Sequence, residues 1–437
     1  MGIVSVIGPK GGIGKTTLSI NTTAALTRAL KQRGSSNSGV CLIDLDLRLP
    51  TISSLLDSHP RKTFFDLFNT LANQTYQVDF LRSLYQVLTR FQAHLDGEAD
   101  EERLARSFGL YKSLNADLFH FSEFEFGDLL HELFLLRGEV HSLQDIQKLD
   151  FILKRLDSAV LRSMVHAREA DSRPSADEYI NYIEEYGFSI IGGEVPVLGK
   201  RVHRRRINEP AFLLLFLEFL NQVFDRFEYT LLDTPAGGVN HLSSLMNVID
   251  QVLFVFDLSN SIAVNGSIDA LHSFIDYYED FCADYQAGAL TGLDREFASR
   301  MTVKEGEETF LASMQAKKFG ILFNRSSESR EVVEALGRLR EYLDTLDKYE
   351  TYKDRIHIVG LLPNHKVINI TNNRGALFYN KDMGLTARMT GIAESILNRN
   401  ANCPTLASSD KDILKYLARP GGGGFSTPLV RLASAFG

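Results

Sequence analysis

Short, nearly continuous apolar runs recur along the chain and predict buried β-strands. Seven such runs occur, at 2–7, 40–44, 188–191, 229–233, 251–256, 319–323 and 356–360. A strand covered on both faces needs apolar side chains on both, so these runs are typical of parallel sheets. Between the first two runs, a helical pattern extends from about Thr16 to Gln32 and stops before Gly34. The order strand–helix–strand predicts an α/β fold with a mostly parallel, twisted sheet flanked by helices.

The pattern changes between about Pro60 and Gly187, where strand signals fade and helical periodicity takes over. Its best-defined part places apolar residues three or four positions apart, at Ile146, Leu149, Leu153, Leu156, Val160 and Met164. We therefore predict a helical insertion over 60–187, dividing an α/β domain made of 1–59 and 188–400. Residues 401–437 are predicted to form a C-terminal tail with a glycine-rich linker at 421–424.

The composition indicates a globular protein. Of the 437 residues, 44% are hydrophobic and 23% are charged, and no apolar run is long enough for a membrane span. The three cysteines lie far apart, which excludes a disulfide framework or paired motif and predicts a reducing, cytoplasmic compartment. The N-terminus runs directly into the first strand, so we expect no cleaved signal peptide. The net charge of −8 argues against a globally basic nucleic-acid binder.

A phosphate-binding loop follows the first strand. The run Lys10-Gly11-Gly12-Ile13-Gly14-Lys15-Thr16-Thr17 lies between a predicted strand and a predicted helix, as a P-loop requires. Its glycines let backbone amides approach phosphate oxygens, Lys15 serves the β- and γ-phosphates, and the Thr16 hydroxyl serves Mg²⁺. Thr17 opens the helix whose N-terminal dipole faces the phosphates. The sequence therefore predicts a P-loop NTPase that binds ATP with Mg²⁺ and hydrolyses it.

Lys10 is a second lysine inside this loop and is absent from the generic pattern. The run KGGxGKTT resembles the deviant Walker A loop of the ParA/MinD family of ATPases. The resemblance covers about residues 1–58 and 188–400 and leaves out the helical insertion. It implies an ATP-dependent homodimer in which Lys10 reaches the partner's phosphates. A cation supplied in this way stabilises transition-state charge only when two subunits meet.

Two further motifs resemble the switches of that family. Asp44-Leu45-Asp46 ends the second strand, and the resemblance implies that Asp44 supports the magnesium shell while Asp46 orients the attacking water. Asp233-Thr234-Pro235-Ala236-Gly237-Gly238 resembles the Walker B and switch II motif. It implies a magnesium carboxylate at Asp233 and a γ-phosphate sensor at the Gly237 amide. Both carboxylate motifs end strands, where a parallel sheet opens its nucleotide crevice.

Polar residues at the ends of later strands are weaker candidates for functional roles at the nucleotide site. By resemblance, Asn324 and Pro363 would lie beside the adenine base. Asp257 also follows an apolar run, and we interpret it as a helix cap in preference to a functional carboxylate.

Three segments raise the question of partners. The basic run Lys200–Arg206 fits non-specific DNA contact, a solvated loop or pairing of its arginines with the acidic insertion, and we favour the latter two over DNA. At the end of the tail, Leu429, Leu432, Ala433 and Phe436 have helical spacing. A helix this short is marginal, so we favour a disordered end over membrane or partner contact. The insertion lies between the two switch motifs, where it would dock an unidentified protein partner or else cap the fold or extend the dimer interface.

These expectations combine into an ATP-dependent dimerising switch that positions or partitions a cargo. The alternative is a regulatory or defence-associated ATPase whose insertion docks a dedicated protein effector. An iron–sulfur carrier is disfavoured, because the relatives with that function use paired cysteines.

Overall fold

The described part of the chain folds around one mostly parallel sheet. The computed structural model describes residues 2–35, 39–46, 51–58, 60–64, 66–67, 174–193, 210–235, 249–290, 306–315, 317–373 and 377–418, with Asp294 and Ala298. Within these residues the sheet has eight strands in the order β3-β4-β2-β5-β1-β6-β7-β8. The strands are β1 (Gly2–Ile7), β2 (Val40–Asp44), β3 (Asn181–Ile183), β4 (Phe188–Ile191), β5 (Tyr229–Asp233), β6 (Gln251–Asp257), β7 (Lys318–Ser326) and β8 (Ile356–Pro363). All neighbours pair in parallel except β3, which is antiparallel to β4. The predicted α/β fold class and all seven predicted strands are confirmed.

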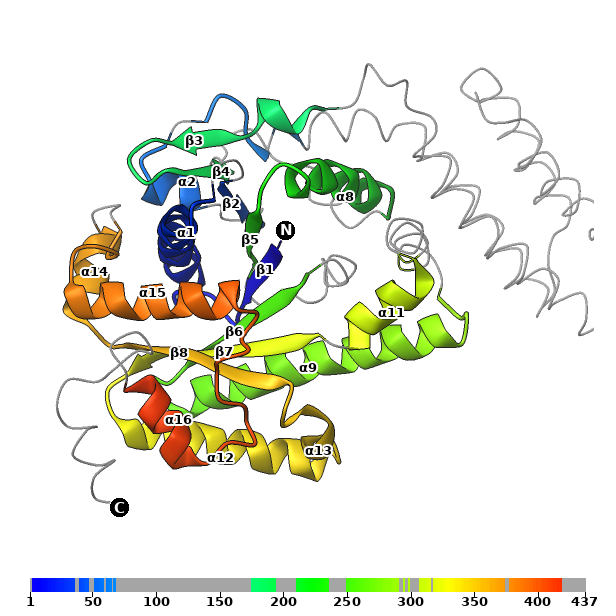
Figure 1. Cartoon of the computed structure of the whole chain (residues 1–437), viewed down its shortest axis with the longest axis vertical. Coiled ribbons are helices and arrows are strands. Elements are labelled where there is room, and N and C mark those ends of the chain that lie inside the picture. The colour runs from blue at the N-terminus through cyan, green and yellow to red at the C-terminus, as the bar shows by residue number, and fades with distance from the viewer. Residues whose placement is uncertain are drawn as a thin grey trace, which may run out of the picture.

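The strands are apolar throughout because two separate cores cover the two faces of the sheet. Along β6, Val252, Phe254 and Phe256 enter one core, while Leu253 and Val255 enter the other. The helices α1 (Lys15–Gln32) and α15 (Met383–Leu397) cover the second face. The first face is covered by α8 (Pro210–Phe224), α9 (Ser261–Gln286) and α12 (Ser329–Thr345). Figure 1 shows α9 and α12 beside β6 to β8, and α8 beside β5. The remaining helical segments are α2 (Ile52–Leu55), η3 (Ala176–Glu178), α11 (Glu307–Gln315), α13 (Tyr349–Tyr352), α14 (Lys366–Asn373) and α16 (Asp410–Leu417).

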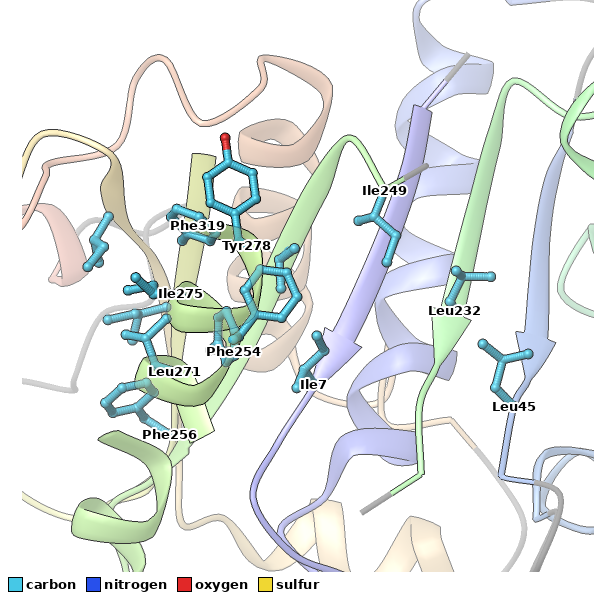
Figure 2. Packing of buried hydrophobic residues seen from close by; sticks show 14 of the residues in the cluster. Ile7, Leu45, Leu232, Ile249, Phe254, Phe256, Leu271, Ile275, Tyr278 and Phe319 are labelled. Atoms are coloured by element: carbon cyan, nitrogen blue, oxygen red, sulfur yellow. The ribbon is translucent and has the colours of Figure 1, made fainter. Parts of the chain in front are cut away.

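Aromatic packing fixes α9 on β6 and β7. Leu271, Ile275 and Tyr278 of α9 lie over the strand side chains (Figure 2). The ring of Phe254 meets that of Phe274 edge to face at 5.4 Å between centroids. The ring of Phe319 also meets that of Phe274, at 5.8 Å between centroids. Offset and edge-to-face aromatic pairs add to the free energy gained by burial. This core therefore holds the two strands whose carboxyl ends belong to the candidate site.

The predicted boundaries of the insertion, 60 and 187, need correction. Strand β3 lies inside that range yet pairs with β4 in the main sheet. Phe64 and Leu67 are buried in the core of the first face, where Phe64 meets Phe216 at 5.8 Å between ring centroids. Residues 60–67 and 174–187, as far as they are described, therefore belong with the sheet. Residues 68–173, which carry the predicted helical pattern, lie outside the described part of the chain.

The predicted start of the C-terminal tail, at 401, is also wrong. Helix α16 packs against β8 and buries Ile413 and Leu417 completely. The Tyr416 hydroxyl donates to the Val359 carbonyl at 3.2 Å. The α/β domain thus extends to at least residue 417, and the glycine linker lies beyond the described residues. No helix among the described residues has the length and hydropathy to cross a membrane.

Helix α16 offers a direct test of this boundary. We expect Leu417→Ala to lower the free energy of unfolding by about 2–5 kcal/mol, because it opens a cavity at a fully buried position. The exposed neighbour Lys415 provides a control, since Lys415→Ala should change that value by no more than about 0.5 kcal/mol. Urea unfolding measures both. If Leu417→Ala matched the control, residues 401–417 would be a loosely attached tail after all.

Candidate functional site

The predicted site residues gather at the carboxyl edge of the sheet. Strand β1 is central, with β5 on one side and β6 on the other. The loop 8–14 leaves β1 and leads directly into α1. Asp44 and Asp233 end β2 and β5 and are in register with each other. Asn324 and Pro363 lie near the ends of β7 and β8. The topology therefore brings together residues more than 300 positions apart.

Two glycines of the loop have backbone angles that other residues rarely adopt. The φ angles of Gly12 and Gly14 are 78° and 91°. A Cβ atom on Gly14 would also lie 2.9 Å from the Asn324 side-chain nitrogen. Around Gly11 and Gly12 such an atom would meet nothing within 4 Å. The outer side of the loop is therefore open, whereas Gly14 is enclosed.

Lys15 lies at the start of α1, with its ammonium turned back toward the loop. Its Nζ donates to the Lys10 carbonyl at 3.1 Å. Burial lowers the pKa of Lys15, while the carboxylates of Asp233 and Asp46 act in the opposite direction. The lysine is 7% exposed, so its charge stands in a poorly solvated loop. Such a cation gains most from an anion placed inside the loop.

Asp233 is the best-held carboxylate of the site. Its two oxygens accept hydrogen bonds from Thr16 Oγ1 at 2.6 Å and from Ser19 Oγ at 2.8 Å. Burial raises the pKa of Asp233 to about 6, an effect that these hydrogen bonds and Lys15 oppose. The side chain thus connects β5 to the first turn of α1. It also places a carboxylate directly beside the Thr16 hydroxyl.

Asp44 is held by backbone amides. One carboxylate oxygen accepts from the Asp46 amide at 3.1 Å. The other accepts from Thr51 at 2.9 Å and Ile52 at 3.1 Å. Burial, together with the charge of Asp233, raises the pKa of Asp44 to about 8. Asp46 follows it as a half-buried residue at the same edge.

The donor set fits Mg²⁺. Among the described residues, no three His, Cys, Asp or Glu side chains form a metal-binding group. Mg²⁺ does not need one, because it commonly uses one or two carboxylates, several waters and substrate phosphates. Thr16, Asp44 and Asp233 would supply the hydroxyl and the carboxylates. A divalent cation beside these two carboxylates would relieve the repulsion from Asp233 that, after burial, raises the pKa of Asp44.

The end of β7 contacts the loop through two consecutive residues. Asn324 Nδ2 donates to the Ile13 carbonyl at 2.7 Å, and Arg325 Nη2 donates to the Gly12 carbonyl at 2.5 Å. Arg325 Nη1 also lies 3.6 Å from the buried carboxylate of Asp257. The interpretation of Asp257 as a helix cap is wrong, because the cap of α9 is Asn260, which accepts from the Ala263 amide. Asp257 is instead the counter-charge of Arg325.

A small pocket adjoins the loop on the β8 side. It is lined by Gly14, Thr17, Leu18, Asn324, Arg325, Leu362, Pro363, Asn364, His365, Ile368 and Phe378. Asn324 and Pro363 thus share one concave surface beside the phosphate loop. Their assignment as adenine contacts stays a prediction.

Several candidate segments lie outside the described residues. They are Gly237 with the rest of 236–248, the basic run Lys200–Arg206, the bulk of the insertion at 68–173 and the tail from 419. The predictions that concern them stay open.

Two contributors were missed by the sequence analysis. Ser19 lies one turn after Lys15, so helical spacing alone brings it to the same face of α1 as the loop. Arg325 carries a charge at a strand end, but its role depends on a backbone angle that the sequence does not reveal. Its φ angle is 62°.

A glycine-rich loop joining the central parallel strand to a helix, with a strand-end carboxylate beside the helix's first hydroxyl, defines the P-loop class of α/β folds. No protein-family model matches the sequence, and no curated protein matches it. Among solved structures, the chain is similar to the cell division ATPase MinD of Pyrococcus furiosus, with 13% identity and a TM-score of 0.42 over 92% of this chain and 99% of that one.

Two other solved structures show similar values. Apo McdA of Cyanothece has 12% identity and a TM-score of 0.43, over 91% of this chain and 99% of that one. A plasmid partition protein of Borrelia burgdorferi has 14% identity and a TM-score of 0.32, over 87% and 99%. The assignment to the P-loop class follows from the glycine-rich loop, the strand order and the contacts of Asp233.

The raised pKa of Asp233 leads to a stability prediction. Between the ordinary carboxyl value of 3.8 and about 6, the folded chain keeps a proton that the unfolded chain has lost. Stability therefore falls as the pH rises through this window and stays lower above it. Asp233→Asn removes the charge and keeps one acceptor oxygen for a hydroxyl, while its NH₂ group can donate to the other hydroxyl. We expect it to raise the Tm of the nucleotide-free protein at pH 8, by roughly 1–2 °C per kcal/mol relieved in a chain of this length.

Differential scanning calorimetry at pH 4 and pH 8 measures the effect, which should shrink at pH 4. Asp344→Asn, at an exposed position on α12, is the matched control and should leave Tm unchanged at both pH values. A lower Tm for Asp233→Asn at pH 8 would mean that the charged carboxylate stabilises the fold.

Proposed function

We propose that this chain is an ATPase switch of the ParA/MinD type, which binds ATP with Mg²⁺, dimerises and hydrolyses the nucleotide. The observation that carries the proposal is the contact between Thr16 and Asp233 at the base of a loop that holds Lys15 and Lys10. That contact places a hydroxyl, a carboxylate and a lysine around one helix start. Magnesium supplied there would neutralise phosphate charge and help to orient the γ-phosphate.

Each residue of the site has a separate role in binding and hydrolysis. The loop amides of 11–14 and the start of α1 bind phosphate oxygens. Lys15 pairs with the β- and γ-phosphates, and Thr16, Asp44 and Asp233 would hold the metal. Asp46 orients the attacking water from the same edge of the sheet. Phosphoryl transfer requires little covalent chemistry from the protein, so positioning and charge stabilisation supply most of the rate enhancement.

Lys10 is the residue that makes the switch depend on dimerisation. Its side chain is exposed and makes no ion pair among the described residues, although its carbonyl accepts from Lys15. A lysine on the open side of the loop can reach a facing subunit. Hydrolysis would then require two chains, and ATP would control whether they associate.

Three kinds of partner are compatible with the proposed switch. A protein partner bound through the insertion, non-specific DNA bound through Lys200–Arg206, and a membrane contact of the tail all involve residues outside the described part. The same holds for a regulatory or defence-associated ATPase with a dedicated effector. We propose a cytoplasmic, ATP-driven switch, which serves either cargo positioning or effector docking.

ATP binding should depend on Lys15. We expect Lys15→Ala to weaken ATP binding about 10- to 100-fold, because the β- and γ-phosphates lose their charged donor. Lys31→Ala, in the last turn of the same helix, is the control and should bind ATP normally. Isothermal titration calorimetry with Mg²⁺ measures both. Wild-type affinity in Lys15→Ala would remove the basis of the proposed function.

Lys10 and Asp46 should both be required for hydrolysis, for different reasons. We expect Lys10→Ala to bind ATP yet stay monomeric, because its charge acts across the dimer. Asp46→Ala should bind ATP, lose most of its turnover and accumulate as a dimer, because only the attacking water is misplaced. Phosphate release and size measurement in ATP and in ADP separate the two variants. A Lys10→Ala chain that is monomeric and fully active would exclude the trans role.

A further inference from the structure

Two consecutive side chains at the end of β7 hold two consecutive carbonyls of the phosphate loop. Asn324 donates to the Ile13 carbonyl at 2.7 Å, and Arg325 donates to the Gly12 carbonyl at 2.5 Å. The amide oxygen of Asn324 accepts from the Arg325 backbone at 3.0 Å, which fixes the orientation of its NH₂ group. Gly14 fits against this group only because it lacks a Cβ atom. These contacts define a clamp made of Asn324 and Arg325.

A regular strand could not place both residues on the loop. Successive side chains of a strand point to opposite faces, so only one of the pair would face the loop. The register between β7 and β8 shifts between Asn324 and Ser326, and Arg325 has a φ angle of 62°. A bulge of this kind re-aims a side chain, and such bulges are common next to functional sites. A non-glycine residue in the left-handed region is strained and persists only where its surroundings hold it.

Asp257 holds the Arg325 side chain in place through an ion pair. Its side chain is 2% exposed and lies 3.6 Å from the Arg325 guanidinium. Its other oxygen accepts from the Ser259 amide at 3.1 Å, which fixes the carboxylate at the end of β6. A buried carboxylate that lost its cation would be strongly destabilising. The guanidinium therefore bridges a fixed charge on β6 and a carbonyl of the loop.

The geometry of the peptide bond turns this clamp into a device for phosphate binding. In a planar trans peptide, the C=O of one residue and the N–H of the next point in opposite directions. Holding the Gly12 and Ile13 carbonyls toward β7 therefore turns the Ile13 and Gly14 amides the other way, into the loop. Successive amides that converge in this way bind anions.

We propose that Asn324 and Arg325 are positioning residues that orient the Ile13 and Gly14 amides for nucleotide phosphates. The inference rests on the proposed function, since it requires phosphates to bind in this loop. It gives Asn324 a task on the phosphate side, in addition to the adenine contact implied by resemblance. The loop would be pre-ordered before any nucleotide arrives.

The test compares ligands with and without a base. Calorimetry measures the binding of three ligands, each with Mg²⁺: ATP, GTP and inorganic tripolyphosphate. The proteins compared are wild type, Arg325→Ala, Arg325→Gly and Asn324→Ala. Arg330→Ala, on the exposed side of α12, is the matched arginine control. We expect the three clamp variants to bind tripolyphosphate about tenfold more weakly than wild type, since each misplaces an amide that bonds a charged oxygen. For the Arg325 variants, the ratio of ATP to GTP affinity should stay as in wild type.

Glycine at 325 keeps the proposal testable if alanine impairs folding. It accepts a positive φ without strain, so Arg325→Gly should lose less stability than Arg325→Ala, although both leave Asp257 without its cation. Asn324→Ala keeps the Arg325–Asp257 pair and should lose phosphate affinity in a chain that folds normally. Unchanged tripolyphosphate binding in all three variants would overturn the inference, as would a loss confined to ATP. If wild type bound ATP and the variants bound tripolyphosphate as tightly as wild type does, only this inference would fail. If wild type bound neither ATP nor tripolyphosphate, the proposed function would fall with it.

Discussion

The site depends on the hydrogen bonds that connect the buried carboxylate of Asp233 to the start of α1. A charged carboxylate is costly to remove from water unless hydrogen bonds or a cation replace the solvent. Here Thr16 and Ser19 donate to its two oxygens, and Lys15 lies close enough to lower its pKa. All three partners belong to the first turn and a half of α1. The carboxylate therefore fixes the start of α1 against β5, and with it the end of the phosphate loop.

The sheet topology determines why this happens at β1. The strands on one side of β1 are β5, β2, β4 and β3, whereas those on the other side are β6, β7 and β8. Connections leaving β1 and its neighbours thus diverge to the two sides, which opens a crevice at the carboxyl edge. The loop after β1 fills that crevice, with Asp233 on one side of it and the clamp of β7 on the other. Support from both sides of a glycine-rich loop compensates for the flexibility that its glycines introduce.

The sequence was informative where one local rule decides the structure. Burial on both faces made the strands readable as apolar runs, and glycine spacing located the loop. Strand β3 was missed because it has three residues, lies at the sheet edge and leaves Tyr182 61% exposed, so its pattern is not that of a buried strand. Asp257 was misinterpreted because Asn260, three residues later, offers the same capping chemistry with the right geometry. The role of Arg325 depends on a bulge and a positive φ, which arise from tertiary contacts that no local pattern encodes.

Asn324 lies between the phosphate loop and the adjoining pocket. Its amide has two N–H donors and an oxygen with two lone pairs. One donor is used on the Ile13 carbonyl and one lone pair on the Arg325 amide, which leaves one of each. The residue also lines the pocket that Pro363 shares, so the remaining groups lie at the edge of the surface where a base would stack. A base that engaged this side chain would stiffen the same amide that orients the phosphate loop. In this arrangement, recognition of the base and ordering of the loop would be coupled through one residue.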